Sequence, residues 1–228
     1  MDRLTRKELK TDKFALEVTH GVEYVSEHKQ QVIRYGSIAA GVVILALIIY
    51  GFLSYRAGVR EDALRTALAI TDQTPGAEST YPTPEARDAA FKKALTEVAD
   101  KYSGSQQGAV ARYYLGALAA DKGDLGTAEK MLRDVVEHGN KNYASVAKLA
   151  LAPVLQAEGK GPEGEKLLRS LIDSPTTFVS KEEAIIALAK YLAPGNPQES
   201  RKLLEPLRTQ RSAISRAALA ALAELPQK

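Results

Sequence analysis

The stretch ARYYLGALAADKGDLGTAEKMLRDVV, residues 111–136, decides the fold of this chain. Gly123 breaks a first helix in a short turn, because glycine adopts positive φ at no steric cost. In the second helix, Ala128 is small enough to allow a close approach of the two helices. Leu132 and Val135 lie three residues apart on one face. The stretch therefore predicts a pair of antiparallel helices joined by a turn.

The same pattern occurs three times with a period of 36 residues. A small residue, a lysine and two apolar residues follow each glycine at fixed distances: Gly123, Gly159, Gly195; Ala128, Gly164, Ser200; Lys130, Lys166, Lys202; Leu132, Leu168, Leu204; Val135, Leu171, Leu207. Repeats of this length stack helix pairs into a solenoid. First helices are expected at 105–122, 143–158 and 180–192, and a closing helix at 212–225.

Several helix starts are marked by residues whose side chains satisfy the free N–H groups at a helix N-terminus. They are Thr83, Asp124, Ser180 and Asn196. Pro197 follows the last of these at the first helical position, with Glu199 two residues further on. Thr83 opens an earlier, incomplete unit, in which Leu95 and Val98 resemble the buried pair of the later copies.

A separate feature is the apolar run from Tyr35 to Tyr55, which contains no charged residue, His, Asn, Gln or Pro. As a helix, its 21 residues extend over about 31 Å, close to a hydrocarbon core of about 30 Å. A buried core helix and a cleaved signal peptide are the alternatives. The 34 residues before the run are too many for the n-region of a signal peptide, and no A-x-A-like site follows before Arg56. An uncleaved signal anchor is expected.

Basic residues predict the orientation of this anchor. Residues 1–34 carry seven Lys and Arg, and residues 56–75 carry three. The N-terminus is therefore expected in the cytoplasm and the C-terminal region on the other side. The predicted domains are a cytoplasmic amphipathic tail (1–34), a transmembrane helix (35–55), a membrane-proximal helix and linker (56–83) and the repeat domain (84–228).

Within the tail, Phe14, Val18, Val22 and Val25 form one helical stripe. Such a helix lies on the inner leaflet or continues into the span, or it docks a cytoplasmic partner.

No catalytic or cofactor-binding motif is found. The chain has no cysteine and three histidines, and its net charge of +3 is too balanced to indicate a nucleic-acid binder. His138 is interpreted as a helix C-terminal residue. Residues 121–124, Asp-Lys-Gly-Asp, are interpreted as a repeat turn rather than a calcium loop. No enzyme, metal or cofactor is expected.

The stretch 111–136 resembles a tetratricopeptide (TPR) motif. Leu115 and Gly116 stand at its Leu-Gly positions, and Ala128 stands at the small position of its second helix. The later copies depart from the motif, because Pro153 interrupts a first helix and the period is 36 rather than 34. The resemblance implies a right-handed solenoid.

The layout of a cytoplasmic N-terminus, one span and a short helical array is similar to the ancillary SecYEG translocon subunit family over about residues 35–222. This resemblance implies a non-enzymatic adaptor in a bacterial inner membrane, with its repeats in the periplasm. The partners implied are the translocon, periplasmic chaperones or exported polypeptides, and no nucleic acid or small-molecule substrate.

A solenoid binds its partners on a concave surface lined by the first helices. In the 36-residue register, this surface is expected to include Arg112, Tyr113, Lys148, Leu149, Gln156 and Ile185. Two alternatives remain open. One is a scaffold for envelope, cell-division or cytochrome c assembly machinery, and the other is a membrane-bound enzyme with an unrecognised carboxylate site.

Overall fold

The computed structural model describes residues 29–77, 79–209 and 213–225. Every regular element in these residues is a helix. The chain divides into two compact units, Met1–Gly58 and Val59–Lys228. The amphipathic stripe predicted for the tail lies outside the described residues.

Helix α2 (Lys29–Leu68) contains the apolar run and continues beyond it without a break. Among the described residues it is the one helix long and apolar enough to cross a membrane, with a mean hydropathy of 2.4 over its most apolar window. None of that window is buried. A soluble core helix would bury it, so α2 is compatible with a single-pass membrane anchor.

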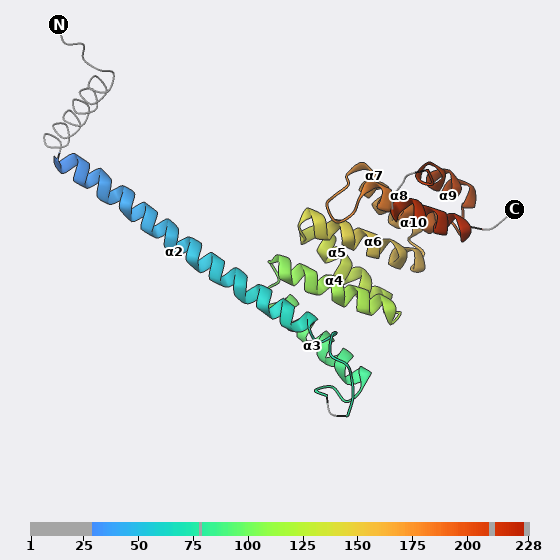
Figure 1. Cartoon of the computed structure of the whole chain (residues 1–228), viewed down its shortest axis with the longest axis horizontal. Coiled ribbons are helices and arrows are strands. Elements are labelled where there is room, and N and C mark those ends of the chain that lie inside the picture. The colour runs from blue at the N-terminus through green and yellow to red at the C-terminus, as the bar shows by residue number, and fades with distance from the viewer. Residues whose placement is uncertain (1–28, 78, 210–212, 226–228) are drawn as a thin grey trace, which may run out of the picture. The chain divides into compact units, whose positions relative to one another are not determined.

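Successive helices lie side by side from α3 to α10, shown from green to red in Figure 1. Each packs on the one before it, which gives the antiparallel pairs α4/α5, α6/α7 and α8/α9. The elements are α3 (Pro84–Lys101), α4 (Gln106–Asp121), α5 (Leu125–His138), α6 (Lys141–Ala157), α7 (Gly161–Asp173), α8 (Lys181–Leu192), α9 (Pro197–Leu204), the 3-10 turn η1 (Glu205–Leu207) and α10 (Ala213–Ala223).

The four predicted N-caps are confirmed. The side chains of Thr83, Asp124, Ser180 and Asn196 each accept a hydrogen bond from a backbone N–H three residues later. The prediction that α6 begins at Tyr143 is wrong by two residues. Asn140 caps this helix by accepting from the N–H groups of Asn142 and Tyr143, and the helix begins at Lys141.

The glycine turns agree with the prediction in two of three copies. Gly123 and Gly159 have φ of 74° and 78°. In both, the residue after the glycine donates its N–H to the carbonyl five residues back, which closes the helix in a Schellman-type turn. Gly195 does not adopt positive φ. Here Pro194 intervenes, and the N–H groups of Gly195 and Asn196 both donate to the carbonyl of Leu192.

Pro153 does not interrupt its helix, contrary to the sequence prediction. It lies inside α6, which continues to Ala157. Proline lacks the N–H that would bond to the carbonyl of Leu149. Because Pro153 lies on the exposed side of α6, this missing bond faces away from the core and the helix tolerates it.

The columns of the 36-residue repeat form the core. Ala128, Gly164 and Ser200 are buried, and so are the apolar columns that begin at Leu132 and Val135. A Cβ added to Gly164 would lie 2.8 Å from the carbonyl oxygen of Ala152 and would also meet the hydroxyl of Tyr191. At Gly164, the small residue is therefore required by close approach between helices.

Candidate protein-binding surface

The first helices of the pairs share one side of the repeat domain. Helix α4 packs on α6, α6 on α8 and α8 on α10, whereas α5, α7 and α9 form no packed interface with one another in the described part of the chain. We call the solvent-facing side of α4, α6 and α8 the first-helix face. It consists of Tyr113, Tyr114 and Ala117 on α4, Val146, Leu149, Pro153 and Gln156 on α6, and Ile186, Ala187 and Lys190 on α8.

Charge is distributed unequally between the two helices of the first two pairs. Helices α4 and α6 carry two charged residues each, and the second helices α5 and α7 carry five Asp, Glu, Lys or Arg each. On α6, this face is uncharged: Pro153 is exposed, and Val146 and Leu149 are half-buried and pack against a core cluster. The first-helix face is thus nearly free of charge over α4 and α6, which is a property of surfaces that bind apolar partners.

Two features of this face suit it to a polypeptide. On α6, Leu149 and Pro153 place apolar side chains on this face, and Pro153 is exposed. On α4, Tyr114 is 37% exposed, and its ring lies edge-on to Tyr113 with 5.6 Å between ring centroids. Tyrosine supplies a large apolar area together with a polar hydroxyl, and it is enriched at binding hot spots.

Three of the six residues predicted to bind a partner lie on this face. Tyr113 is half-buried, and burial together with the nearby Tyr114 raises the pKa of its hydroxyl. Leu149 is half-buried on α6. Gln156 donates its side-chain amide to the carbonyl of Tyr191 at 3.3 Å and so bridges α6 and α8. Their role in binding stays a prediction.

The other three predicted residues face elsewhere. The guanidinium of Arg112 donates to the carbonyls of Ala99 and Ser103 and pairs with Asp134 of α5 at 3.0 Å. Lys148 donates to the hydroxyl of Ser170 on α7 at 3.1 Å. Ile185 is half-buried and packs against the core cluster that contains Leu204 and Leu207, as does the neighbouring Ile186. The 36-residue register alone does not show whether a side chain of a first helix makes contacts within the domain or lies on the first-helix face.

The second helices are linked by a salt-bridge ladder. Arg133 on α5 pairs with Glu129 on the same helix and with Glu163 on α7. The same arrangement recurs 36 residues later, where Arg169 pairs with Glu165 and Glu199. The signal for this ladder is the 36-residue period, because each of its members has a like residue in the next copy.

Glu129 accepts hydrogen bonds from Lys160 and Arg133. These bonds, and the one from Lys160 most of all, lower the pKa of its carboxyl to about 2. Its side chain is only 17% exposed.

The described residues hold no group of three or more His, Cys, Asp or Glu side chains able to bind a metal. His138 ends α5, where its Nδ1 lies 3.2 Å from the carbonyl oxygen of Asp134. Residues 121–124 form the turn between α4 and α5, as predicted, with Asp124 occupied as a cap.

Comparison with known proteins identifies the family. The family model of the tetratricopeptide repeat-like domain matches residues 32–183, about two thirds of the chain. The match includes the apolar run as well as the helices from α3 to α7. No curated protein and no solved structure matches the chain. The chain therefore belongs to the tetratricopeptide repeat-like domain family.

Proposed function

We propose that this protein is a membrane-anchored adaptor that binds other proteins through its first-helix face. TPR-like domains generally mediate protein–protein interactions and serve as non-enzymatic scaffolds. The observation that supports the proposal most is the uncharged, partly exposed stripe of Val146, Leu149 and Pro153 on α6. Extended or partly folded polypeptides expose apolar side chains, and such a stripe offers apolar contacts for them.

The proposal places α2 in a bacterial inner membrane, with the N-terminus in the cytoplasm and the repeats in the periplasm. Its support is the fully exposed apolar window of α2 and the excess of basic residues before it. Tethering at the membrane raises the effective concentration of the repeats beside a membrane machine, so even a weak surface is occupied. The layout of the chain is similar to that of the ancillary translocon subunits. On this basis the machine is the Sec translocon, and the clients are exported polypeptides or periplasmic chaperones.

The topology can be tested with single cysteines, because the chain has none of its own. Glu97→Cys places a thiol at an exposed position of α3, and Lys10→Cys places one in the tail. In cells with a permeabilised outer membrane, an impermeant maleimide should label the cysteine at 97, and should label the cysteine at 10 only after the inner membrane is lysed. Labelling of 10 but not 97 would reverse the orientation, and labelling of both before lysis would argue against a membrane span.

The translocon assignment has its own test. Lysine crosslinking in cells, followed by mass spectrometry, should link translocon subunits to lysines after residue 56. The second candidate, a scaffold for envelope, cell-division or cytochrome c assembly, rests on the same fold. If only proteins of those machines are crosslinked, the adaptor role stands and the translocon assignment fails.

A further inference from the structure

The space between neighbouring second helices is filled differently along the array. We call the space between α3 and α5, above α4, the first groove, and the space between α5 and α7, above α6, the second groove. Four charged side chains close the second groove. Arg133 lies 2.7 Å from Glu163, and Lys160 lies 2.7 Å from Glu129, which Arg133 also contacts.

The burial pattern shows which residues of the first groove occupy the equivalent positions. The buried residues of α3 match those of α5 with an offset of 37, because Phe91, Leu95 and Val98 correspond to Ala128, Leu132 and Val135. Helices α5 and α7 keep the 36-residue offset. Arg133 and Glu163 are therefore replaced by Thr96 and Thr127, and Glu129 and Lys160 by Lys92 and Asp124.

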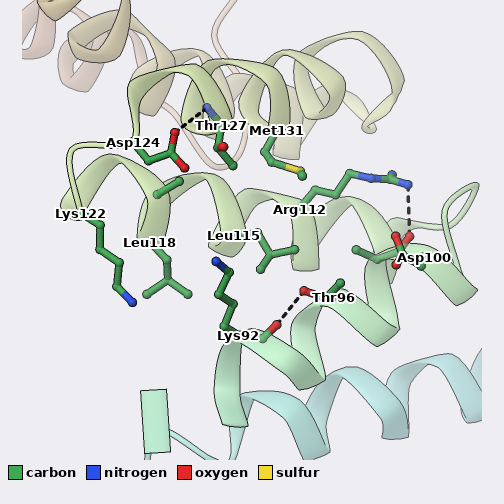
Figure 2. A pocket seen from close by; sticks show the side chains of 12 residues that line it. Lys92, Thr96, Asp100, Arg112, Leu115, Leu118, Lys122, Asp124, Thr127 and Met131 are labelled. Carbon is green, nitrogen blue, oxygen red and sulfur yellow. Dashed lines mark hydrogen bonds between the residues drawn. The ribbon is translucent and has the colours of Figure 1, made fainter. Parts of the chain in front are cut away.

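This replacement leaves a cavity in the first groove. It has a volume of about 160 Å³ and is lined by all four of the replacing residues. The floor is apolar and consists mainly of Leu115, Leu118 and Met131 (Figure 2). A cavity of about 150 Å³ with an apolar lining is known to hold a ring the size of benzene, so this one has room for one apolar side chain.

The charged side chains around the cavity differ in whether they already have bonding partners. Arg112 is occupied by its bonds to Ala99, Ser103 and Asp134. Lys92 and Lys122 lie toward the same end of the cavity, on either side of Leu118 (Figure 2), and neither makes an ion pair within the described residues.

Asp124 is the one carboxylate of the lining at this end (Figure 2). It accepts a hydrogen bond from the N–H of Thr127. Hydrogen bonds with Thr127, and after them the charge of Lys92, lower the pKa of this carboxyl. Two lysines against one carboxylate leave this end with a net positive charge.

We propose that the first groove binds an acidic peptide segment of a partner protein, with one apolar side chain in the cavity and an adjacent carboxylate between Lys92 and Lys122. The cavity accounts for the apolar side chain, and the two lysines without ion pairs account for the carboxylate. This site lies on the side of the second helices and does not depend on the first-helix face or on the translocon assignment.

The test uses the full chain in lipid nanodiscs and a fluorescein-labelled peptide, Gly-Ser-Glu-Leu-Glu-Ser-Gly, in an anisotropy titration. Saturable binding is expected. It should weaken about tenfold when Lys92→Gln and Lys122→Gln are combined, and also when leucine in the peptide is replaced by alanine. A matched control is Lys166→Gln with Lys202→Gln, which removes two exposed lysines from α7 and α9 and should leave binding unchanged.

The groove can also be closed by copying the second groove into the first. Thr96→Arg with Thr127→Glu rebuilds the pair formed by Arg133 and Glu163, and residue 127 is at the third position of α5, where glutamate is favoured. This variant should melt at or above the wild-type temperature and should no longer bind the peptide. The proposal is overturned if the wild type shows no saturable binding, or if the lysine pair variant binds as tightly as the wild type. Equal affinity of a folded Thr96→Arg/Thr127→Glu variant would also overturn it.

Discussion

Arg133 bridges two repeats: its Nη1 lies 2.7 Å from Oε1 of Glu163 on the next second helix. Thirty-six residues later, Arg169 repeats the contact with Glu199, also at 2.7 Å. These ion pairs join neighbouring second helices, which otherwise form no packed interface in the described part of the chain. The ladder thus lies on the side of the second helices, away from the first-helix face.

Reversing the charge of Arg133 should destabilise the domain and should be partly repaired by a second reversal. Arg133→Glu sets three glutamates near one another and should cost about 1 kcal/mol, because both partners are partly exposed to solvent. Glu163→Arg in the same chain should recover part of this loss. Urea unfolding measures both free energies, with Lys166→Glu as an exposed control on α7. Equal stability of the single and double variants would show that the pair is not coupled.

The ladder also predicts a dependence of stability on acid. The pKa of Glu129 lies near 2, below its usual value of 4.5, so the ionised form is stabilised in the folded state. Its contribution is complete above about pH 4.5, and it is lost as the pH falls toward 2. In Glu129→Gln, the fall of the melting temperature between pH 5 and pH 2 should be shallower than in the wild type. Parallel profiles for the two proteins would contradict this assignment.

Ser200 offers the opposite case, a substitution expected to stabilise. Its Oγ is buried and has no hydrogen-bond partner among the described residues. An unpaired buried hydroxyl costs about 1–3 kcal/mol, so Ser200→Ala should raise the free energy of unfolding by up to about 1 kcal/mol. The reverse change in the first copy, Ala128→Ser, should lower it. A loss of stability in Ser200→Ala would indicate that the hydroxyl has a partner in solution.

Gly164 should not tolerate a methyl group. A Cβ there would lie 2.8 Å from the carbonyl of Ala152, which is backbone and cannot move aside. Gly164→Ala should cost about 1–3 kcal/mol, measured by thermal unfolding. Gly126→Ala is the matched control, because it is on the preceding second helix with open space around it and should be neutral or stabilising. Similar losses in both variants would show that helix packing is not the cause.

Much of this fold follows from the sequence, because each repeat contains the same local signals for helix starts, turns and buried positions. The caps at Asp124 and Asn196 depend on residues a few positions away, and the structure confirms them. The exceptions depend on tertiary context. Pro153 remains inside α6 because its missing N–H faces solvent, and Gly195 avoids positive φ because Pro194 changes the turn.

The candidate surface was less predictable. The repeat register selects residues of the first helices, but it does not say which way each side chain points. Arg112 has the charge expected of a binding residue, yet it is taken up by two carbonyls and Asp134. The sequence did not predict the first groove. It becomes evident only from the spatial match of α3 with α5, which puts Thr96 and Thr127 at the positions equivalent to Arg133 and Glu163.

Binding of partners at the first-helix face can be tested directly. A photo-crosslinking amino acid placed at Pro153, which is exposed at the centre of the α6 stripe, tests it in cells against the same probe at Lys166 on α7. Adducts with other envelope proteins or exported polypeptides are expected from position 153, and few from position 166. Adducts from 166 with none from 153 would contradict it.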